Sequence, residues 1–377
     1  MNLPYRRAVL GIALAIGMLG ALPVAVFAAQ PSCGQTLTAN TTLTANLDCS
    51  GFPGDNALNI GANGITVNLN GKTILGPAGY DNLSGIDTQG YNRTTVTNGT
   101  IRDYTYGVYS YASNRTTASY LTIDGNDTAS SYGIYQSYGV NSVYNHLTVV
   151  DTYDAVYMEY NATTKVMNSN LTASNNALYN YDTTANVVSN NTLHGNYGVY
   201  EYESNRNSYT GNTANNGSYG FYLQCDGYGN VFVNGNTANN NSNAGFYVYE
   251  CYYVDHPVDG YIGSRIVNNI ANGNDYGFED YYSYNELWRM NTANDNDSDG
   301  FYFDYPSNHR IVSNTALRND SDGFEIQDNY SYYNVEKISS NTARRNGSYG
   351  FYAGYGAPGS DNIARLNSTA NCYNVDC

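Results

Sequence analysis

One short motif recurs along most of this 377-residue chain: a small residue, an apolar residue and then, in most copies, a tyrosine. The copies follow one another after about 22 residues, and so constant a period indicates a solenoid in which each repeat forms one coil. Their small residues are Gly85, Gly107, Gly133, Ala155, Ala177, Gly198, Gly220, Gly245, Gly277, Gly300, Gly323 and Gly350.

The residues inside one period predict strands rather than helices. Strong helix formers are scarce in the repeats, and short stretches of alternating apolar and polar residues are separated by Asn, Gly, Ser and Asp. Fully extended, about 22 residues trace roughly 73 Å, which suits one coil of three short strands. Stacked coils would pair in parallel about 4.8 Å apart. The chain is therefore expected to be all-β.

A column of asparagines keeps nearly the same phase as the motif. Asparagine side chains at one turn of successive coils can bond to one another along the stack and satisfy polar groups in a thin core. The alternative is that they are ordinary turn residues. The members assigned from spacing are Asn98, Asn170, Asn191, Asn212, Asn236, Asn269, Asn291, Asn314 and Asn341.

The opening of the repeat region resembles a known family. Cys33–Leu37, Leu43–Cys49 and Gly64–Ile74 are similar to the N-terminal cap and first coils of secreted NosD-like β-helix proteins of the pectate-lyase-like superfamily. The resemblance covers roughly residues 33–371. It implies a right-handed parallel β-helix of about thirteen three-strand coils behind a disulfide-tied cap. It does not fix an activity, because the superfamily includes lyases, hydrolases, epimerases, adhesins and proteins with no known reaction.

The ends of the chain predict an exported protein. Arg6 and Arg7 precede an apolar run and a cleavage site after Ala28, so residues 1–28 read as a signal peptide rather than an uncleaved anchor. Residues 29–60 are assigned to an N-terminal cap, 61–371 to the β-helix and 372–377 to a C-terminal disulfide tail. No later segment is apolar enough to span a bilayer. The protein is expected to be secreted, on the cell surface or periplasmic.

Six cysteines in an exported chain predict disulfides. Six cysteines allow fifteen pairings. Closeness in sequence favours three of them: Cys33–Cys49, Cys225–Cys251 and Cys372–Cys377.

The charge balance limits the partners. Asp and Glu number 32 against 16 Lys and Arg, which gives a net charge of −16 and no basic footprint for nucleic acid. The NosD resemblance raises copper delivery, which would use His, Met or Cys ligands. His146, His194, His256 and His309 occupy different phases of the repeat, so each is expected at a turn or on the surface rather than in one metal-binding column.

Strand alternation predicts a face rich in tyrosine. Counted from the small residue of the motif, position +1 should face the core, +2 and +4 should face solvent, and +3 should face the core. Position +2 is tyrosine in nine of the twelve copies and acidic in the others. We predict that this face binds an extended polysaccharide. The alternatives are a purely structural ladder of rings and a surface for self-association into fibres. The predicted binding residues are Tyr109, Tyr135, Tyr157, Tyr179, Tyr200, Tyr222, Tyr247, Tyr302 and Tyr352.

The longest spacing, from Gly245 to Gly277, predicts a loop beside this face. Paired carboxylates suit glycoside hydrolysis and clustered ones suit Ca²⁺. The catalytic candidates are Asp255, His256, Glu279 and Asp280, and a possible Ca²⁺ site comprises Asp226, Asp255 and Asp259. A basic catalytic residue of the kind that lyases of this superfamily use is missing from the tyrosine columns. A non-catalytic binder is therefore favoured over a lyase, hydrolase or epimerase, and no cofactor other than Ca²⁺ is expected.

Overall fold

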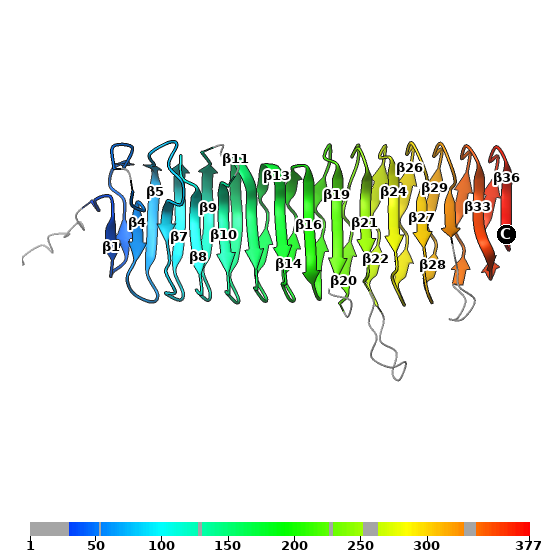
Figure 1. Ribbon diagram of the computed structural model, residues 1–377, viewed down its shortest axis with the longest axis horizontal. Coiled ribbons are helices and arrows are strands. Elements are labelled where there is room, and N and C mark those ends of the chain that lie inside the picture. The colour runs from blue at the N-terminus through cyan, green and yellow to red at the C-terminus, as the bar shows by residue number, and fades with distance from the viewer. Residues whose placement is uncertain (1–29, 53, 127–129, 226–228, 252–262, 328–336) are drawn as a thin grey trace, which may run out of the picture.

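The protein is a rod of stacked coils, seen side-on in Figure 1 with β1 at one end and the C-terminus at the other. The computed structural model describes residues 30–377 except 53, 127–129, 226–228, 252–262 and 328–336. Every element in the described part is a β-strand, and all strand pairs are parallel. The predicted all-β, right-handed parallel β-helix is confirmed, with about 14 turns against the thirteen expected.

Each coil contributes strands to three strips that run the length of the rod, and long strands bend from one strip into the next. The motif strip contains β1 (Gln35–Leu37), β4 (Leu58–Ile60), β6 (Ser84–Asp87), β8 (Tyr106–Tyr111), β10 (Tyr132–Ser137), the end of β11 (Val143–Glu159), the end of β13 (Asn170–Tyr181), β16 (Tyr197–Ser204), β19 (Tyr219–Cys225), β21 (Ala244–Tyr249), β24 (Tyr276–Tyr281), β27 (Phe301–Asp304), β30 (Phe324–Gln327), β33 (Tyr349–Ala357) and β36 (Ala370–Val375).

The second strip contains β2 (Thr41–Thr42), the starts of β5 (Thr66–Leu75), β7 (Thr95–Arg102), β9 (Thr117–Asp124) and β11, and then β12 (Lys165–Met167), β14 (Val187–Ser189), β17 (Asn207–Thr210), β20 (Val231–Asn234), β22 (Arg265–Val267), β25 (Leu287–Arg289), β28 (Arg310–Val312), β31 (Lys337–Ser339) and β34 (Gly359–Ser360). The third contains β3 (Leu47–Asp48), later parts of β5, β7, β9 and β11, the start of β13, and β15 (Thr192–His194), β18 (Thr213–Ala214), β23 (Ile270–Asn272), β26 (Thr292–Asn294), β29 (Thr315–Leu317), β32 (Thr342–Arg344) and β35 (Ile363–Arg365).

The core changes composition half-way along the rod. In the coil that contains β15 and β16, Leu193 and Val199 are fully buried. One coil later their places are taken by Ala214 and Phe221, so a gain of volume in one strip is matched by a loss in another. From there the phenylalanines at motif position +1 stack on one another with ring centroids 4.6–4.9 Å apart.

The motif glycines are needed because neighbouring coils approach closely. A Cβ added at Gly198 would lie 2.5 Å from the carbonyl oxygen of Gly220 and 2.5 Å from the Cβ of Ala214. Real Cβ atoms do not come so close to other heavy atoms. The small residue is thus explained by packing between coils.

An asparagine ladder closes the turn between the second and third strips. In each pair the backbone N–H and the side-chain Nδ2 of one asparagine donate to the Oδ1 of the next, for example from Asn212 to Asn236 at 2.8 and 3.0 Å. The predicted members from Asn191 to Asn341 belong to this ladder, which Asn362 extends. Asn98 and Asn170 do not belong to it. They are exposed, and Ser169 takes the ladder position one residue earlier.

A second asparagine ladder, which the spacing did not reveal, closes the turn before the motif strip. Its bonds repeat the pattern of the first ladder. The members are Asn241, Asn274, Asn296, Asn319, Asn346 and Asn367.

The three predicted disulfides, Cys33–Cys49, Cys225–Cys251 and Cys372–Cys377, are present. The coils begin at β1, which pairs with β4 inside the segment assigned to the cap, and β36 carries the last coil into the segment assigned to the tail. The predicted signal peptide lies outside the described residues. In the described part of the chain, no helix is long and apolar enough to cross a membrane.

Candidate functional site

The tyrosine face is the outer surface of the motif strip, formed by the residues at positions +2 and +4 of each coil. Strand pairing aligns position +2 from coil to coil, so Tyr109 pairs with Tyr135 and Tyr135 with Tyr157. Their side chains are half-buried. Seven rings form an unbroken stack with centroids 4.7–5.3 Å apart and planes within 14° of parallel: Tyr109, Tyr135, Tyr157, Tyr179, Tyr200, Tyr222 and Tyr247.

The stack stops where an acid interrupts the column. Glu279 separates Tyr247 from Tyr302, and Glu325 separates Tyr302 from Tyr352. The described strands of the motif strip contain no Lys or Arg. The face is therefore aromatic over most of its length and acidic toward the C-terminal end.

A further tyrosine column lies beside the stack, at the residue just before the motif glycine. Tyr197 and Tyr219 stack at 5.4 Å, and Tyr197 meets the edge of Tyr200 at 4.9 Å. The sequence signal for this column was the recurring phrase Tyr-Gly, which the count of positions +2 and +4 passed over. Its members are Tyr106, Tyr132, Tyr197, Tyr219, Tyr276 and Tyr349.

Ring stacking determines which atoms of the tyrosines a ligand can contact. Ring faces within the stack are covered by the neighbouring rings, so the edges and hydroxyl groups are what remains for contact. Burial raises the pKa of Tyr222 to about 12, so its phenol is protonated at neutral pH. Tyr135 and Tyr157 donate to the two oxygens of Glu159 at 2.6 and 3.2 Å. The face therefore presents a row of hydroxyl groups, carried by stacked tyrosine rings, to solvent.

A polar groove follows the edge of this face along the rod. It is a shallow depression of about 710 Å³ that lies mostly open to solvent. It crosses six successive coils, a length of about 24 Å at the usual strand spacing. The lining residues are Ala173, Ser174, His194, Gly195, Asn196, Asn216, Gly217, Ser218, Asn240, Asn241, Ser242, Gly273, Asp275 and Asp297.

The groove is hollow because the turns that form it must be built from small residues. A Cβ at Gly217 would lie 2.5 Å from the carbonyl oxygen of Gly195. The side chains that remain are short and polar, and some bond across coils, as Ser218 Oγ does to Asn196 Oδ1 at 2.5 Å. Amide and hydroxyl groups therefore line a channel that runs in the direction of the rod.

An acidic cluster lies on the motif strip near the groove's C-terminal end. Asp299, Asp322 and Glu325 each place a carboxylate oxygen within 4.8 Å of the others, and both aspartates are buried. The backbone N–H of Asp322 donates to Asp299 Oδ1 at 2.7 Å. Burial raises the pKa of Asp299 to about 8, against that hydrogen bond and with help from Glu325. A buried acid beside a second carboxylate can hold a proton near neutral pH or bind a hard cation.

The sequence matches the right-handed β-helix region over residues 54–193 and 258–371, which is more than half of the chain. The chain belongs to the right-handed β-helix family. No curated protein matches this β-helix protein significantly. The closer resemblance to NosD-like proteins stays a prediction from the sequence.

Solved structures share the fold of this β-helix protein. A point variant of the periplasmic alginate epimerase AlgG aligns with a TM-score of 0.53 and 15% identity, over 83% of this chain and 77% of that one. An AlgG double variant gives 0.50 and 13%, over 84% and 77%. The A-module of the Azotobacter vinelandii mannuronan C-5 epimerase AlgE4 gives 0.46 and 14%, over 90% and 89%. Identity this low shows the fold alone.

The two described catalytic candidates, Glu279 and Asp280, lie on opposite sides of their strand. Glu279 lies on the tyrosine face, whereas Asp280 points into the core, because successive residues of a strand face opposite sides. These two acids do not form one site. Asp226, Asp255, His256 and Asp259 lie outside the described residues.

The histidines differ in their surroundings. His194 lines the groove, and His146 stacks on Tyr120 at 4.7 Å. His309 lies at a turn, one of the two expected positions, but it is buried rather than on the surface. It faces inward directly before β28, next to Asp280.

Glu279 makes the stability of the fold depend on pH. Burial raises its pKa from 4.5 to about 7, although a hydrogen bond from Tyr281 opposes the shift. A carboxyl with a raised folded-state pKa favours the fold when protonated, so its contribution is lost as pH rises from about 4.5 to 7. Glu279→Gln should therefore raise the melting temperature more at pH 8 than at pH 5. Thermal unfolding at both values checks this. The control, Glu203→Gln at an exposed position, should keep the wild-type pH dependence, and an equal gain for Glu279→Gln at both pH values would contradict the assignment.

Proposed function

We propose that this protein is a secreted or surface-associated β-helix protein that binds an extended, uncharged polysaccharide without cleaving it. The observation that carries the proposal is the groove beside the tyrosine face. It runs along six coils and is lined mainly by amide and hydroxyl groups, and its lining residues Asn196 and Ser218 are followed directly by the half-buried Tyr197 and Tyr219. Such groups match the hydroxyls and ring edges of a sugar chain. One protein of the same fold, AlgG, is named for its action on alginate, which supports a polysaccharide partner but, since alginate is acidic, not an uncharged one.

The charge of the face favours an uncharged polymer over a polyanion. The described strands of the motif strip carry no Lys or Arg, and Asp275 and Asp297 line one end of the groove. A chain of carboxylates would be repelled by these groups and by the net charge of −16. The rigid groove also keeps the ordering cost of binding low, because few side chains must be immobilised.

Filling the groove should abolish this binding. Ser218→Trp places a large ring in the middle of the groove. We expect the affinity of this variant for the polysaccharide that the wild type binds to fall at least tenfold. The matched control is Ser208→Trp, at an equally half-buried serine on the second strip, which should bind like the wild type. Affinity electrophoresis of the three proteins against a panel of neutral and acidic polysaccharides, with and without Ca²⁺, is the measurement. Equal retention of both variants would contradict the proposal.

The acidic cluster favours a second function, a polysaccharide-cleaving or epimerising enzyme. Asp299 has a pKa of about 8 and lies beside Glu325, and an acid that stays protonated next to a second carboxylate is the arrangement used in glycoside hydrolysis. The same incubations test it. If the wild type shortens or alters the sugar chains and Asp299→Asn does not, the protein is an enzyme and the binding proposal is wrong.

A further inference from the structure

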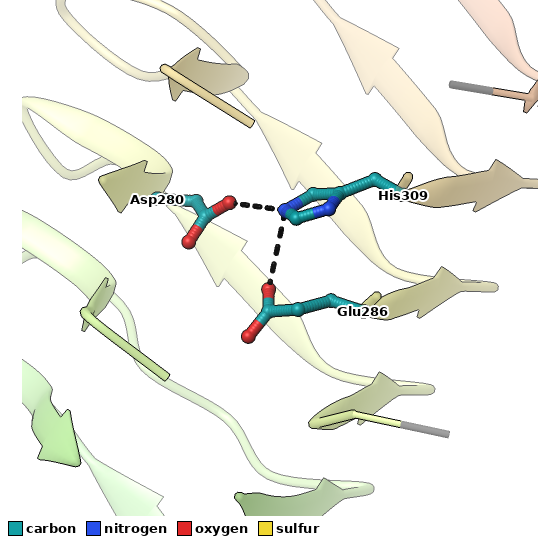
Figure 2. Close-up of side chains that lie close together, drawn as sticks. All are labelled: Asp280, Glu286 and His309. Atoms are coloured by element: carbon teal, nitrogen blue, oxygen red, sulfur yellow. Dashed lines mark hydrogen bonds and ion pairs between the residues drawn. The ribbon is translucent and has the colours of Figure 1, made fainter. Parts of the chain in front are cut away.

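A cluster of ionisable side chains lies inside the solenoid, separate from the tyrosine face and the groove. Asp280 comes from β24, Glu286 directly precedes β25, and His309 directly precedes β28 in the next coil. All three side chains are completely buried. Figure 2 shows them pointing toward one another, Asp280 from β24 and the other two from just before β25 and β28.

Both carboxylates lie close to the same nitrogen atom of His309. His309 Nε2 lies 2.6 Å from Asp280 Oδ2 and 3.6 Å from Glu286 Oε2. Among the described residues, neither carboxylate has an ion pair with Lys or Arg. Two buried carboxylates without a cation are strongly unfavourable, because their hydration is lost and nothing balances their charge.

The hydrogen bonds around the cluster fix which nitrogen of His309 faces the acids. His309 Nδ1 lies 3.1 Å from the backbone oxygen of Ser307, and a carbonyl oxygen only accepts, so Nδ1 carries a hydrogen. The Nε2 nitrogen therefore points at two acceptor oxygens. At 2.6 Å from Asp280 Oδ2, Nε2 is at hydrogen-bond distance and a proton fits between the two atoms. A metal ion bound by both atoms would need them to lie about 3.3 Å apart, a small outward shift of either side chain. Trp288 Nε1 donates to Glu286 Oε2 at 2.8 Å and holds that carboxylate in place, as outer partners of metal ligands do.

A second observation points to a metal ion rather than to a proton. Asp280 Oδ1 is buried without a hydrogen-bond partner, and an unsatisfied buried oxygen is costly. The Glu286 carboxyl has Ser264 as a further hydrogen-bond partner. We propose that Asp280, Glu286 and His309 form an internal binding site for one divalent transition-metal ion, for which zinc is the best match. His309 Nε2 and one oxygen from each acid supply three ligands, and the unpartnered Asp280 Oδ1 supplies the fourth. One doubly charged ion with two carboxylates and a neutral imidazole makes the cluster neutral.

The burial of the site determines how the ion enters. A ligand set enclosed by the coils is assembled only on folding, so metal binding and folding are coupled. The ion would join two successive coils, Asp280 and Glu286 from one and His309 from the next. The ion would hold these two coils together at a place where the core is polar.

The test is to unfold the purified full chain, remove metal with a chelator, and refold it with or without Zn²⁺. We expect about one zinc per chain after dialysis, by elemental analysis, and a melting temperature higher by about 5 °C than that of the metal-free protein. His309→Gln should bind no zinc and melt at the same temperature with and without it. The control is Glu201→Gln, in a separate buried network with Asn207 at 3.1 Å, which should keep the wild-type zinc content.

Two outcomes would overturn the proposal. One is wild-type protein that retains no Zn²⁺ and whose melting temperature is unchanged by it, in which case protons neutralise the cluster. The other is equal zinc retention by wild type and His309→Gln, which would place the ion elsewhere. If His309→Gln does not fold, Co²⁺ refolded into the wild type decides, because a four-coordinate nitrogen–oxygen site gives visible absorption and its absence would contradict the proposal.

Discussion

Asn291→Ala should destabilise the β-helix by about 4 kcal/mol, because it leaves several buried polar groups without partners at once. Asn291 Nδ2 donates to the carbonyl oxygen of Ile266 at 2.7 Å and to Asn314 Oδ1 at 3.0 Å. Its Oδ1 accepts from the backbone N–H and the side chain of Asn269 at 2.9 and 3.1 Å. Alanine removes all of these bonds and admits no replacement, since the neighbouring coils enclose the site.

The control for this prediction is an asparagine that spacing alone assigned to the same column. Asn170 is exposed and lies outside the ladder, so Asn170→Ala should change stability by less than about 0.5 kcal/mol. Urea unfolding followed by circular dichroism measures both variants. Similar losses for the two would show that the ladder contributes no more than surface asparagines do.

Phe301→Ala should cost about 4 kcal/mol through the cavity that it leaves in the core. The Phe301 ring is fully buried and stacks between Phe278 at 4.8 Å and Phe324 at 4.6 Å. The adjacent residue offers a matched comparison, because Tyr302 has a ring of similar size on the outer side of the same strand. Its register neighbours are Glu279 and Glu325, so no parallel stack is lost.

Tyr302→Ala is accordingly expected to cost only about 1 kcal/mol. The difference between the two variants measures the inward and outward alternation directly. A larger loss for Tyr302→Ala than for Phe301→Ala would mean that the outer aromatic column, and not the phenylalanine stack, holds the coils together. Thermal and urea unfolding of both proteins provide the comparison.

The fold could be predicted from the sequence because a solenoid repeats its local rules in every coil. The motif small residue, the inward apolar residue and the outward tyrosine recur in phase, and the strand registers follow that phase. The errors came where the phase shifts. Asn170 was misassigned by one residue, because its coil has one residue more between the third strip and the motif strip than the next coil has: Thr172 pairs with His194, but Asn176 pairs with Tyr197.

The candidate site was less predictable because it depends on volumes and turns. No motif marks the groove, which arises where small residues such as Gly195 and Gly217 meet on neighbouring coils. The alternation rule alone places Asp280 at an inward position, yet its sequence neighbour Glu279 made the two look like one acidic pair. The buried partnership of Asp280 with His309 joins residues 29 apart in sequence, and only the stacking of coils reveals it.

Binding to oligosaccharides of increasing length tests the proposed function most directly. Fragments of the polysaccharide that the protein retains best would be titrated calorimetrically into the wild type. A chain lying along the groove should gain affinity with each added sugar until it spans the six coils, about 24 Å, and then level off. Ser218→Trp should remove this dependence. An affinity that is already complete for one or two sugars, or no binding at any length, would contradict a groove built for an extended polymer.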